Sequence, residues 1–86
     1  MGQLSKLPNI GEKVEQQLNA AGIFTYDELK EKGAERAWLM IQKNDPSACI
    51  HRLLALEGAI RGIPKGLLPE DRRAELKAFY TAHKIK

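Results

Sequence analysis

The sequence has few of the residues on which cross-linked or metal-stabilised domains depend. It contains one cysteine, Cys49, and two histidines, His51 and His83, among its 86 residues. A single cysteine excludes an internal disulfide bond, and no Cys-x-x-Cys or His-x-x-x-His pair exists that could hold zinc. We therefore expect no metal and no cofactor. The scarcity of cysteine fits a reducing, cytoplasmic environment.

Long apolar runs are missing as well. The longest runs, such as those that include residues 38–41 and 53–56, cover about one helical turn, whereas a membrane span needs ~20 apolar residues. No signal-peptide pattern opens the sequence, and no linker rich in serine or glycine divides it. With 43% hydrophobic and 29% charged residues, the sequence predicts one folded domain over residues 1–86 that has no contact with a membrane.

Catalytic groupings are also absent. A nucleophile needs a base and an orienting partner, and neither Cys49 nor any serine has them in a recognisable motif. The carboxylates lie mostly in the predicted first turns of helices or beside lysines, where helix capping and surface pairing explain them. We therefore expect no enzymatic activity. Cys49 is interpreted as a small core residue, and His51 as a surface or boundary residue.

Helical periodicity, by contrast, runs through the whole sequence, and no segment shows the sustained two-residue alternation of a strand. The predicted helices run from about Gly11 to Gly22, from Thr25 to Gly33, from Ala34 to about Lys43, from Asp45 to about Ile60, and from Pro69 onward. A further helical turn is expected over residues 3–7, with two leucines pointing inward. The fold class is therefore all-α, a compact bundle of about five short helices.

Two helix ends carry recognisable signals. Gly22 stands where a left-handed C-terminal cap is expected, and Ile23 and Phe24 are predicted to make apolar contacts after it. Thr25 and Glu28 have the spacing of a capping box at the start of the next helix.

The fourth predicted helix is apolar over most of its circumference, so it should be the central helix of the bundle. Asp45 is predicted as its N-cap and Pro46 as its first residue, where the missing N–H costs nothing. Its main apolar stripe is formed by Cys49, Leu53, Leu56 and Ile60.

Large aromatic side chains are scarce, at 6% of the sequence. Trp38, Met40, Phe79 and Tyr80 could form a stacking platform for nucleic-acid bases, but their spacing matches helix faces directed at the core. Because few other large side chains are available to fill a core, we interpret these four as core residues.

Positive charge is concentrated near the C-terminus. Residues 1–60 hold seven Lys/Arg and eight Asp/Glu, whereas residues 61–86 hold seven Lys/Arg and three Asp/Glu. A phosphate-contacting surface and an ordinary solvated face both remain open for the basic residues of this region. They are Lys65, Arg72, Arg73, Lys77, Lys84 and Lys86. Lys65, Arg73 and Lys77 are the candidates for a secondary basic surface.

The most specific local signal is the segment Leu-Pro-Asn-Ile-Gly at residues 7–11. A proline, an asparagine that tolerates positive φ and a glycine within five positions predict a sharp turn that leads into a helix N-terminus. Backbone amides at such a position have no partner within the helix and, with the helix dipole, can hold an anion such as a phosphate.

This turn resembles the helix-hairpin-helix element, whose backbone amides hold a DNA phosphate without reading bases. The resemblance implies phosphate contacts from the amides around Asn9, Ile10 and Gly11, with added positive charge from Lys13. The match is imperfect, because such elements commonly have a second glycine where Asn9 stands. Glu12 and Glu15 also place negative charge nearby. Degenerate hairpins of this kind serve as structural turns in SAM-like helical domains that bind proteins.

Several separated motifs, in order, resemble the C-terminal domain of the TfoX (Sxy) family of competence regulators. They are Leu7 to Gly11, Leu18 with residues 21–23, Thr25 with Asp27 and Leu29, residues 33–34, residues 53–59, and Leu68-Pro69 with Glu75-Leu76. The resemblance covers about Leu4 to Tyr80. It implies an all-helical, SAM-like domain with a helix-hairpin-helix-like element, in bacterial proteins linked to the regulation of DNA-uptake genes, and it implies no catalytic residues.

Two functions stay open on the sequence alone. The first is a weak, sequence-independent DNA-binding module that uses the turn, Lys13 and the basic C-terminal third. The second is a protein-interaction domain that docks onto a transcription component or onto a separate N-terminal partner. The second hypothesis predicts an exposed apolar patch or a dimer in solution. The sequence does not define the oligomeric state.

Overall fold

A computed structural model describes residues 4–84 of the chain. Its elements are η1 (Leu4–Lys6), α1 (Glu12–Ala20), α2 (Tyr26–Lys32), α3 (Ala34–Asn44), α4 (Ile50–Arg61), η2 (Lys65–Leu67) and α5 (Glu70–His83), where η denotes a 3₁₀ turn. This part of the chain contains no strand, so the predicted all-α bundle of five short helices is confirmed. None of the helices within residues 4–84 has the length and apolar character that crossing a membrane requires.

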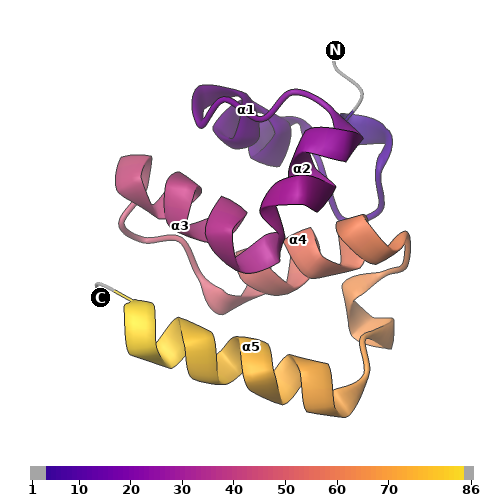
Figure 1. Cartoon of the computed structure of the whole chain (residues 1–86), viewed down its shortest axis with the longest axis vertical. Helices are drawn as coiled ribbons and strands as arrows, with labels where there is room; N and C mark the ends of the chain where they lie inside the picture. Colours follow the sequence, from indigo (N-terminus) through magenta and orange to yellow (C-terminus); the bar gives the residue numbers. More distant parts are fainter. Residues whose placement is uncertain (1–3, 85–86) are drawn as a thin grey trace.

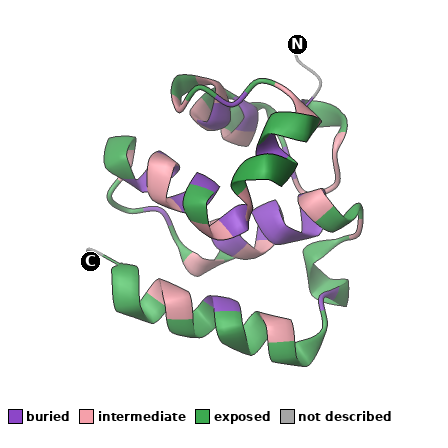
Figure 2. Ribbon diagram, in the orientation of Figure 1, coloured by how far each residue is buried: buried purple, intermediate pink, exposed green. Residues whose placement is uncertain are grey.

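The α4 helix is the centre of the bundle, as predicted. It packs against α2, α3, α5 and η2, whereas α1 packs against η1 and α3. Figure 1 shows α3 and α4 running through the middle of the molecule, with α1 and α5 on opposite sides of them. The buried segments in Figure 2 are concentrated on α4 and α3, while α5 is mostly exposed.

The core consists of aliphatic side chains around one indole. The largest fully buried side chains are Trp38, Leu4, Leu18, Ile23, Leu29, Ile41, Leu53, Leu56 and Leu76. Each α-helix contributes at least one of them, so all five helices are held by the same hydrophobic core.

Both predicted helix-end signals are confirmed. Gly22 adopts a φ of +88°, and the N–H of Ile23 donates to the carbonyl of Leu18 at 2.8 Å, which closes the C-terminal end of α1. At the start of α2, the Glu28 amide donates to Thr25 Oγ1 at 3.1 Å, and the Thr25 amide donates to Glu28 Oε1 at 3.0 Å. This reciprocal pair is a complete capping box.

Phe24 does not make the apolar contacts that the sequence predicted for it. Its side chain is 55% exposed, whereas Ile23 is fully buried. Successive residues of this extended connection point to opposite sides, so only one of the two can reach the core. The Phe24 amide donates to Glu28 Oε1 at 2.8 Å and is the largest contribution that lowers the pKa of Glu28.

The α4 helix begins later than predicted, with Cys49 as its N-cap instead of Asp45. The Asp45 carboxylate instead accepts hydrogen bonds from the amide and hydroxyl of Ser47, at 3.1 and 2.6 Å, and so stabilises a turn that contains Pro46. Cys49 has extended backbone angles and is exposed. The prediction of a core cysteine is therefore wrong, because Cys49 is a non-helical N-cap and its side chain does not continue the stripe of the buried Leu53.

Trp38, Phe79 and Tyr80 pack in or against the core, as interpreted from their spacing. Trp38 is fully buried and meets Phe79 and Tyr80 edge to face, with ring centroids 6.2 and 5.6 Å away. Its indole N–H donates to the carbonyl of Cys49 at 3.1 Å. Met40 is partly buried and packs at the edge of the same cluster. These contacts fasten α5 and the start of α4 to α3.

Candidate nucleic-acid interface

The turn at residues 7–11 joins η1 to α1. The Leu7 amide donates to the carbonyl of Leu4 at 3.0 Å, and the Ile10 amide donates to the carbonyl of Leu7 at 3.3 Å. Asn9 has a φ of +69° and is the one non-glycine residue with positive φ in the described chain. Ile10 is buried in the core. The sharp turn predicted from the sequence is thus present, and Ile10 anchors it.

The side chain of Asn9 binds backbone groups 46 to 56 positions further along the chain. Its Nδ2 donates to the carbonyl of Ile63 at 3.0 Å and to that of Ala55 at 3.5 Å, and its Oδ1 accepts from the Lys65 amide at 3.1 Å. We call this set of contacts the Asn9 clamp. Asn9 therefore has a structural role, and only its backbone remains available to a ligand.

Gly58 makes the Asn9 clamp possible. A Cβ atom at this position would lie 2.4 Å from Asn9 Nδ2 and 2.7 Å from the carbonyl oxygen of Ile63, distances that no packed Cβ tolerates. Only a glycine on α4 leaves room for the turn to approach. Sequence reasoning missed this residue, although a glycine inside a predicted helix is the kind of signal that indicates such an approach.

The N-terminus of α1 is open to solvent. Its N-cap, Gly11, is exposed and has no side chain with which to cap the first-turn amides, so those of Glu12 and Lys13 have no capping partner in the described chain. Gly11 has a φ of −96°, which any residue can adopt, and a Cβ placed there would meet no atom within 4 Å. Neither the backbone nor the packing of this chain requires glycine at position 11.

Three lysines belong to the segments that meet at this turn. Lys6 and Lys13 lie on the two elements that the turn connects, and the backbone of Lys65 is attached to the turn through the Asn9 clamp. All three are exposed. The structure thus brings Lys65, one of the predicted basic residues, next to the predicted phosphate site.

The two acidic residues of the first turn of α1 differ in their surroundings. Glu15 is 5% exposed, and its Oε2 accepts a hydrogen bond from the Ser5 amide at 3.3 Å. Glu12 is exposed. Only Glu12 therefore presents a negative charge at the surface of the open helix end.

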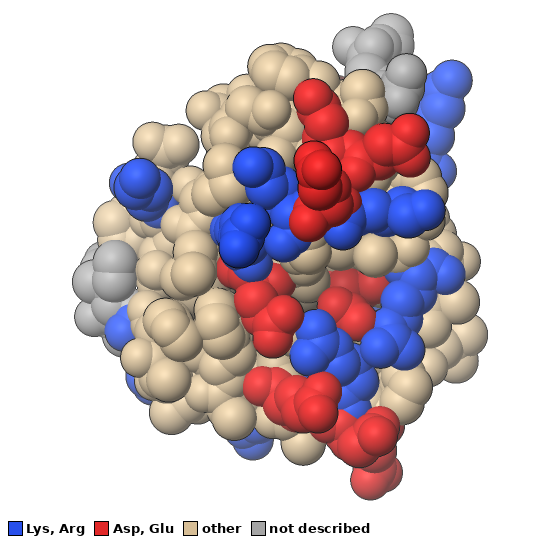
Figure 3. Space-filling view, viewed as in Figure 1, with Lys and Arg blue, Asp and Glu red and all other residues tan. Residues whose placement is uncertain are grey.

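The other predicted basic residues lie elsewhere. Arg73 and Lys77 are exposed on α5, which Figure 1 shows on the far side of α3 and α4 from α1. They do not converge with Lys13 on one surface. Figure 3 shows positive and negative side chains interspersed over the face that it presents, without one basic patch. Lys84 lies near the Tyr80 ring at 5.9 Å, and Lys86 is outside the described residues.

Arg72 is not available for phosphate contact, contrary to the sequence-based grouping. Its guanidinium forms ion pairs with Glu57, Glu35 and Glu75, each at 3.1 Å. Glu57 also pairs with Arg61 at 2.7 Å. We call these five residues the Glu57 network. It joins α5 to α3 and α4. The sequence hinted only at its local pairs, Glu57 with Arg61 and Arg72 with Glu75, which are four and three residues apart.

The charges of this network depend on one another. Burial by itself would raise the pKa of Glu57, but hydrogen bonds from Arg72 and Arg61 outweigh it and lower that pKa. The hydrogen bond to Glu57 is likewise the main reason why the pKa of Arg72 is raised. Both groups stay ionised at neutral pH. Glu57, which is 7% exposed, is an exception to the interpretation that most carboxylates serve as caps or surface pairs.

No other constellation within residues 4–84 suggests chemistry. No group of three or more His, Cys, Asp or Glu residues there could hold a metal ion. His51 is exposed, as interpreted from the sequence. The arrangement can therefore offer a ligand backbone amides, lysines and surface grooves.

Comparison with protein families places residues 1–80 in the TfoX C-terminal domain family. Among curated proteins, the chain is similar to protein Sxy of Escherichia coli strain K12, with 36% identity over 74 residues. That match covers 86% of this chain and 35% of Sxy, so the chain spans about a third of the length of this relative.

Two solved structures from Listeria monocytogenes have the same fold. A triclinic crystal form of an uncharacterized protein is 48% identical, with a TM-score of 0.92 over 94% of this chain and 92% of the other. A tetragonal form of a protein of unknown function is 49% identical, with a TM-score of 0.89 over 91% of this chain and 96% of the other. These relatives support the fold.

Proposed function

Because the chain belongs to the TfoX C-terminal domain family, we propose that it is a non-enzymatic module of a competence-type regulator that binds the DNA backbone weakly through its turn. The groups offered there are backbone amides and lysine ammonium groups. These groups contact phosphate oxygens and read no base edges, so binding is independent of sequence.

The observation that carries this proposal is Gly11. It is an exposed glycine with ordinary backbone angles and open space around its missing side chain. Neither the backbone angles nor the packing requires a glycine here. Its missing side chain leaves room for an anion to approach the uncapped amides of the helix N-terminus closely. The turn, held in place by the Asn9 clamp, presents these amides in a fixed geometry.

The surrounding charge supports phosphate binding but limits its strength. Lys6, Lys13 and Lys65 lie around the site, Glu15 is buried against η1, and Glu12 remains as an opposing charge. One turn contacts few phosphates. If the protein neutralises about two phosphates, the slope of the log association constant against the log salt concentration is about −2. The affinity for DNA therefore falls as salt is added.

Fluorescence anisotropy of a labelled DNA duplex at low salt tests the proposal. We expect saturable binding at micromolar protein, and Lys13→Glu should weaken it by about tenfold because an attraction becomes a repulsion. Gly11→Ser should also weaken binding, since its side chain occupies the space above the amides. Serine is a better N-cap than glycine, so this variant should melt at the same or a slightly higher temperature.

Lys77→Glu on α5 is the matched control, because it changes the net charge by the same amount far from the turn. We expect it to leave affinity within about twofold at moderate salt, where distant charges are screened. Equal losses for Lys13→Glu and Lys77→Glu would contradict a site at the turn. Absence of binding at high micromolar protein would contradict DNA binding altogether.

A further inference from the structure

A continuous groove lies between α1 and the C-terminal half of α3. It consists of two surface hollows, of about 240 and 490 Å³, and both are lined by Ala20 of α1 and Asn44 of α3. We call it the α1–α3 groove. Its principal lining residues are Gln17, Ala20, Ala21, Met40, Lys43 and Asn44.

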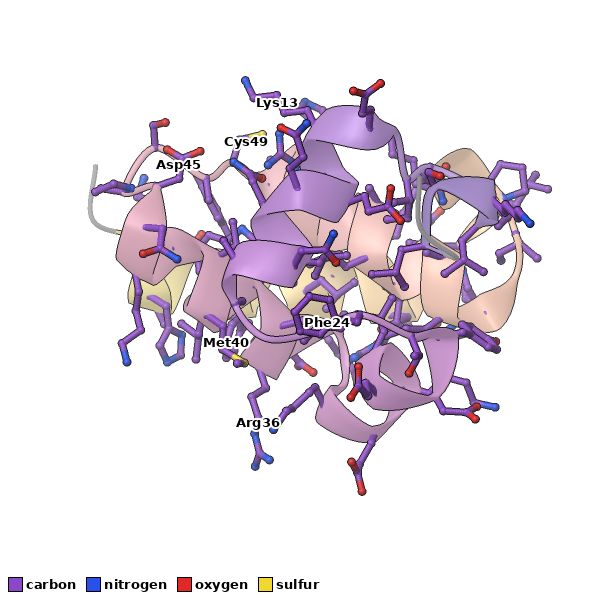
Figure 4. All side chains as sticks on the ribbon, turned by 90° about the horizontal axis from the view of Figure 1, so that it is seen from above. Lys13, Phe24, Arg36, Met40, Asp45 and Cys49 are labelled. Atoms are coloured by element: carbon purple, nitrogen blue, oxygen red, sulfur yellow. The ribbon has the colours of Figure 1, made fainter. Side chains whose placement is uncertain are left out.

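The shape of the groove suits a helix as its occupant. Two alanines, Ala20 and Ala21, form its wall on the α1 side, and small side chains allow another backbone to come close. Met40 contributes a flexible apolar side chain that adapts to different partners. Phe24, 55% exposed, follows Ala21 by three residues, and Figure 4 shows it on the same face as Met40 and Arg36.

The charges at the rim of the groove are positive and unpaired. Lys13 lines one end. Lys43 lines the second hollow. Arg36 lies outside the two hollows, one turn before Met40 on the same face of α3. Within residues 4–84, Arg61 and Arg72 are the only cations in ion pairs, so none of these three is paired there.

The one carboxylate among the residues that line the groove is already occupied. Asp45 accepts hydrogen bonds from the Ser47 hydroxyl and amide and from Gln17 Nε2, the last at 3.1 Å. These bonds, those from Ser47 first, lower the pKa of Asp45. Gln17 in turn accepts from Arg52. Lys13, Arg36 and Lys43 are therefore left to pair with charges brought by another molecule.

We propose that the α1–α3 groove docks an acidic amphipathic helix of a partner protein. Apolar side chains spaced by three and four residues would meet Met40, Phe24 and the two alanines, and flanking carboxylates would meet the basic rim. A second copy of this chain is a poor occupant, because its net charge of +3 would oppose the same rim. The groove shares Lys13 with the proposed DNA site, so the variants that test it are made at Met40, Arg36 and Lys43, away from the turn.

Selection of helical peptides from a random displayed library against the 86-residue chain tests the proposal. We expect enriched sequences that are acidic and carry apolar residues at helical spacing. A synthetic peptide of the enriched sequence should shift the amide NMR signals of residues in the α1–α3 groove and of Phe24. Enriched peptides without acidic character, shifts confined to other surfaces, or failure to enrich any peptide would each overturn the proposal.

Variants then distinguish the groove from general charge effects. Met40→Glu should reduce peptide affinity at least about tenfold, as for the loss of a central apolar contact. Because Met40 is partly buried, the exposed pair Arg36→Glu with Lys43→Glu provides a second variant that leaves the core intact. The matched pair Arg73→Glu with Lys77→Glu on α5 should retain binding. Equal loss in both pairs, or a concentration-dependent dimer that protects the groove, would contradict the proposal.

Discussion

Glu57 and Gly58 are neighbours on α4, yet they hold distant parts of the chain in physically different ways. Glu57 pairs with Arg61 and Arg72 and so draws α5 onto α4. Gly58 contributes no side chain and instead leaves the space in which Asn9 reaches the carbonyls of Ala55 and Ile63. One contact depends on charge, and the other depends on the absence of a Cβ atom.

The two sets of contacts therefore respond differently to pH, to salt and to substitutions. The Glu57 network can adjust its geometry, because long side chains have several ways to pair, but its strength depends on pH and salt. The Asn9 clamp is made of neutral groups, so neither pH nor salt affects it directly. Its weakness is steric, since a single added methyl group cannot be accommodated.

The largest effect should come from Gly58→Ala. Its Cβ would lie 2.7 Å from a backbone oxygen, so the turn and the loop that carries Ile63 must move. We expect the free energy of unfolding to fall by about 3 kcal/mol, a value that already allows for the better helix propensity of alanine. The melting temperature should therefore fall by ~12–24 °C. Gly11→Ala is the matched control and should lower the free energy of unfolding by at most about 1 kcal/mol, because alanine is a poorer N-cap than glycine but meets no steric clash at this position. Similar losses in thermal melts of both variants would show that the close approach at Gly58 is unimportant.

Substitutions at Asn9 separate the backbone from the side chain of the clamp. Asn9→Ala loses three hydrogen bonds and places alanine, which tolerates the left-handed region less well than asparagine, at a φ of +69°. We therefore expect the free energy of unfolding to fall by about 2 kcal/mol. Asn9→Gly keeps the backbone conformation and should lose about half as much. Urea titrations of the two variants give both values. If Asn9→Gly were as stable as the natural chain, the side-chain contacts would contribute nothing.

Glu57→Gln should have the smallest effect and the one that depends on pH. At neutral pH we expect a loss of about 1 kcal/mol, because Arg72 keeps Glu35 and Glu75 as partners. The folded chain lowers the pKa of Glu57 below its ordinary value of 4.5, so its ionised form stabilises the fold above that pH. The stabilisation is lost as the pH falls through the lowered pKa.

Chemical unfolding of the natural chain and of Glu57→Gln from pH 7 to pH 3 measures this effect. We expect the two stability curves to approach each other below about pH 4.5, where protonation makes Glu57 resemble glutamine. A difference that stays constant over the whole range would assign the loss to packing rather than to charge.

Local features of the fold could be predicted from the sequence. The capping box of Thr25 and Glu28, the left-handed Gly22 and the apolar central helix are set by residues a few positions apart. The start of α4 was predicted wrongly because Asp45 and Pro46 satisfy the rules for a turn as well as those for a helix start. The turn at residues 7–11 was predicted correctly, but the contacts of the Asn9 side chain around it were not.

The sequence by itself determined that this chain forms a small all-α domain of the TfoX C-terminal family with a sharp turn at residues 7–11, because caps, periodicity and turn residues act over short distances. Only the tertiary structure decided that the Asn9 side chain is hydrogen-bonded to residues 46 to 56 positions away. It also decided that Arg72 is paired with three carboxylates and that Phe24 and Cys49 face solvent. These outcomes depend on how the helices pack, and the local pattern around each residue is compatible with more than one packing.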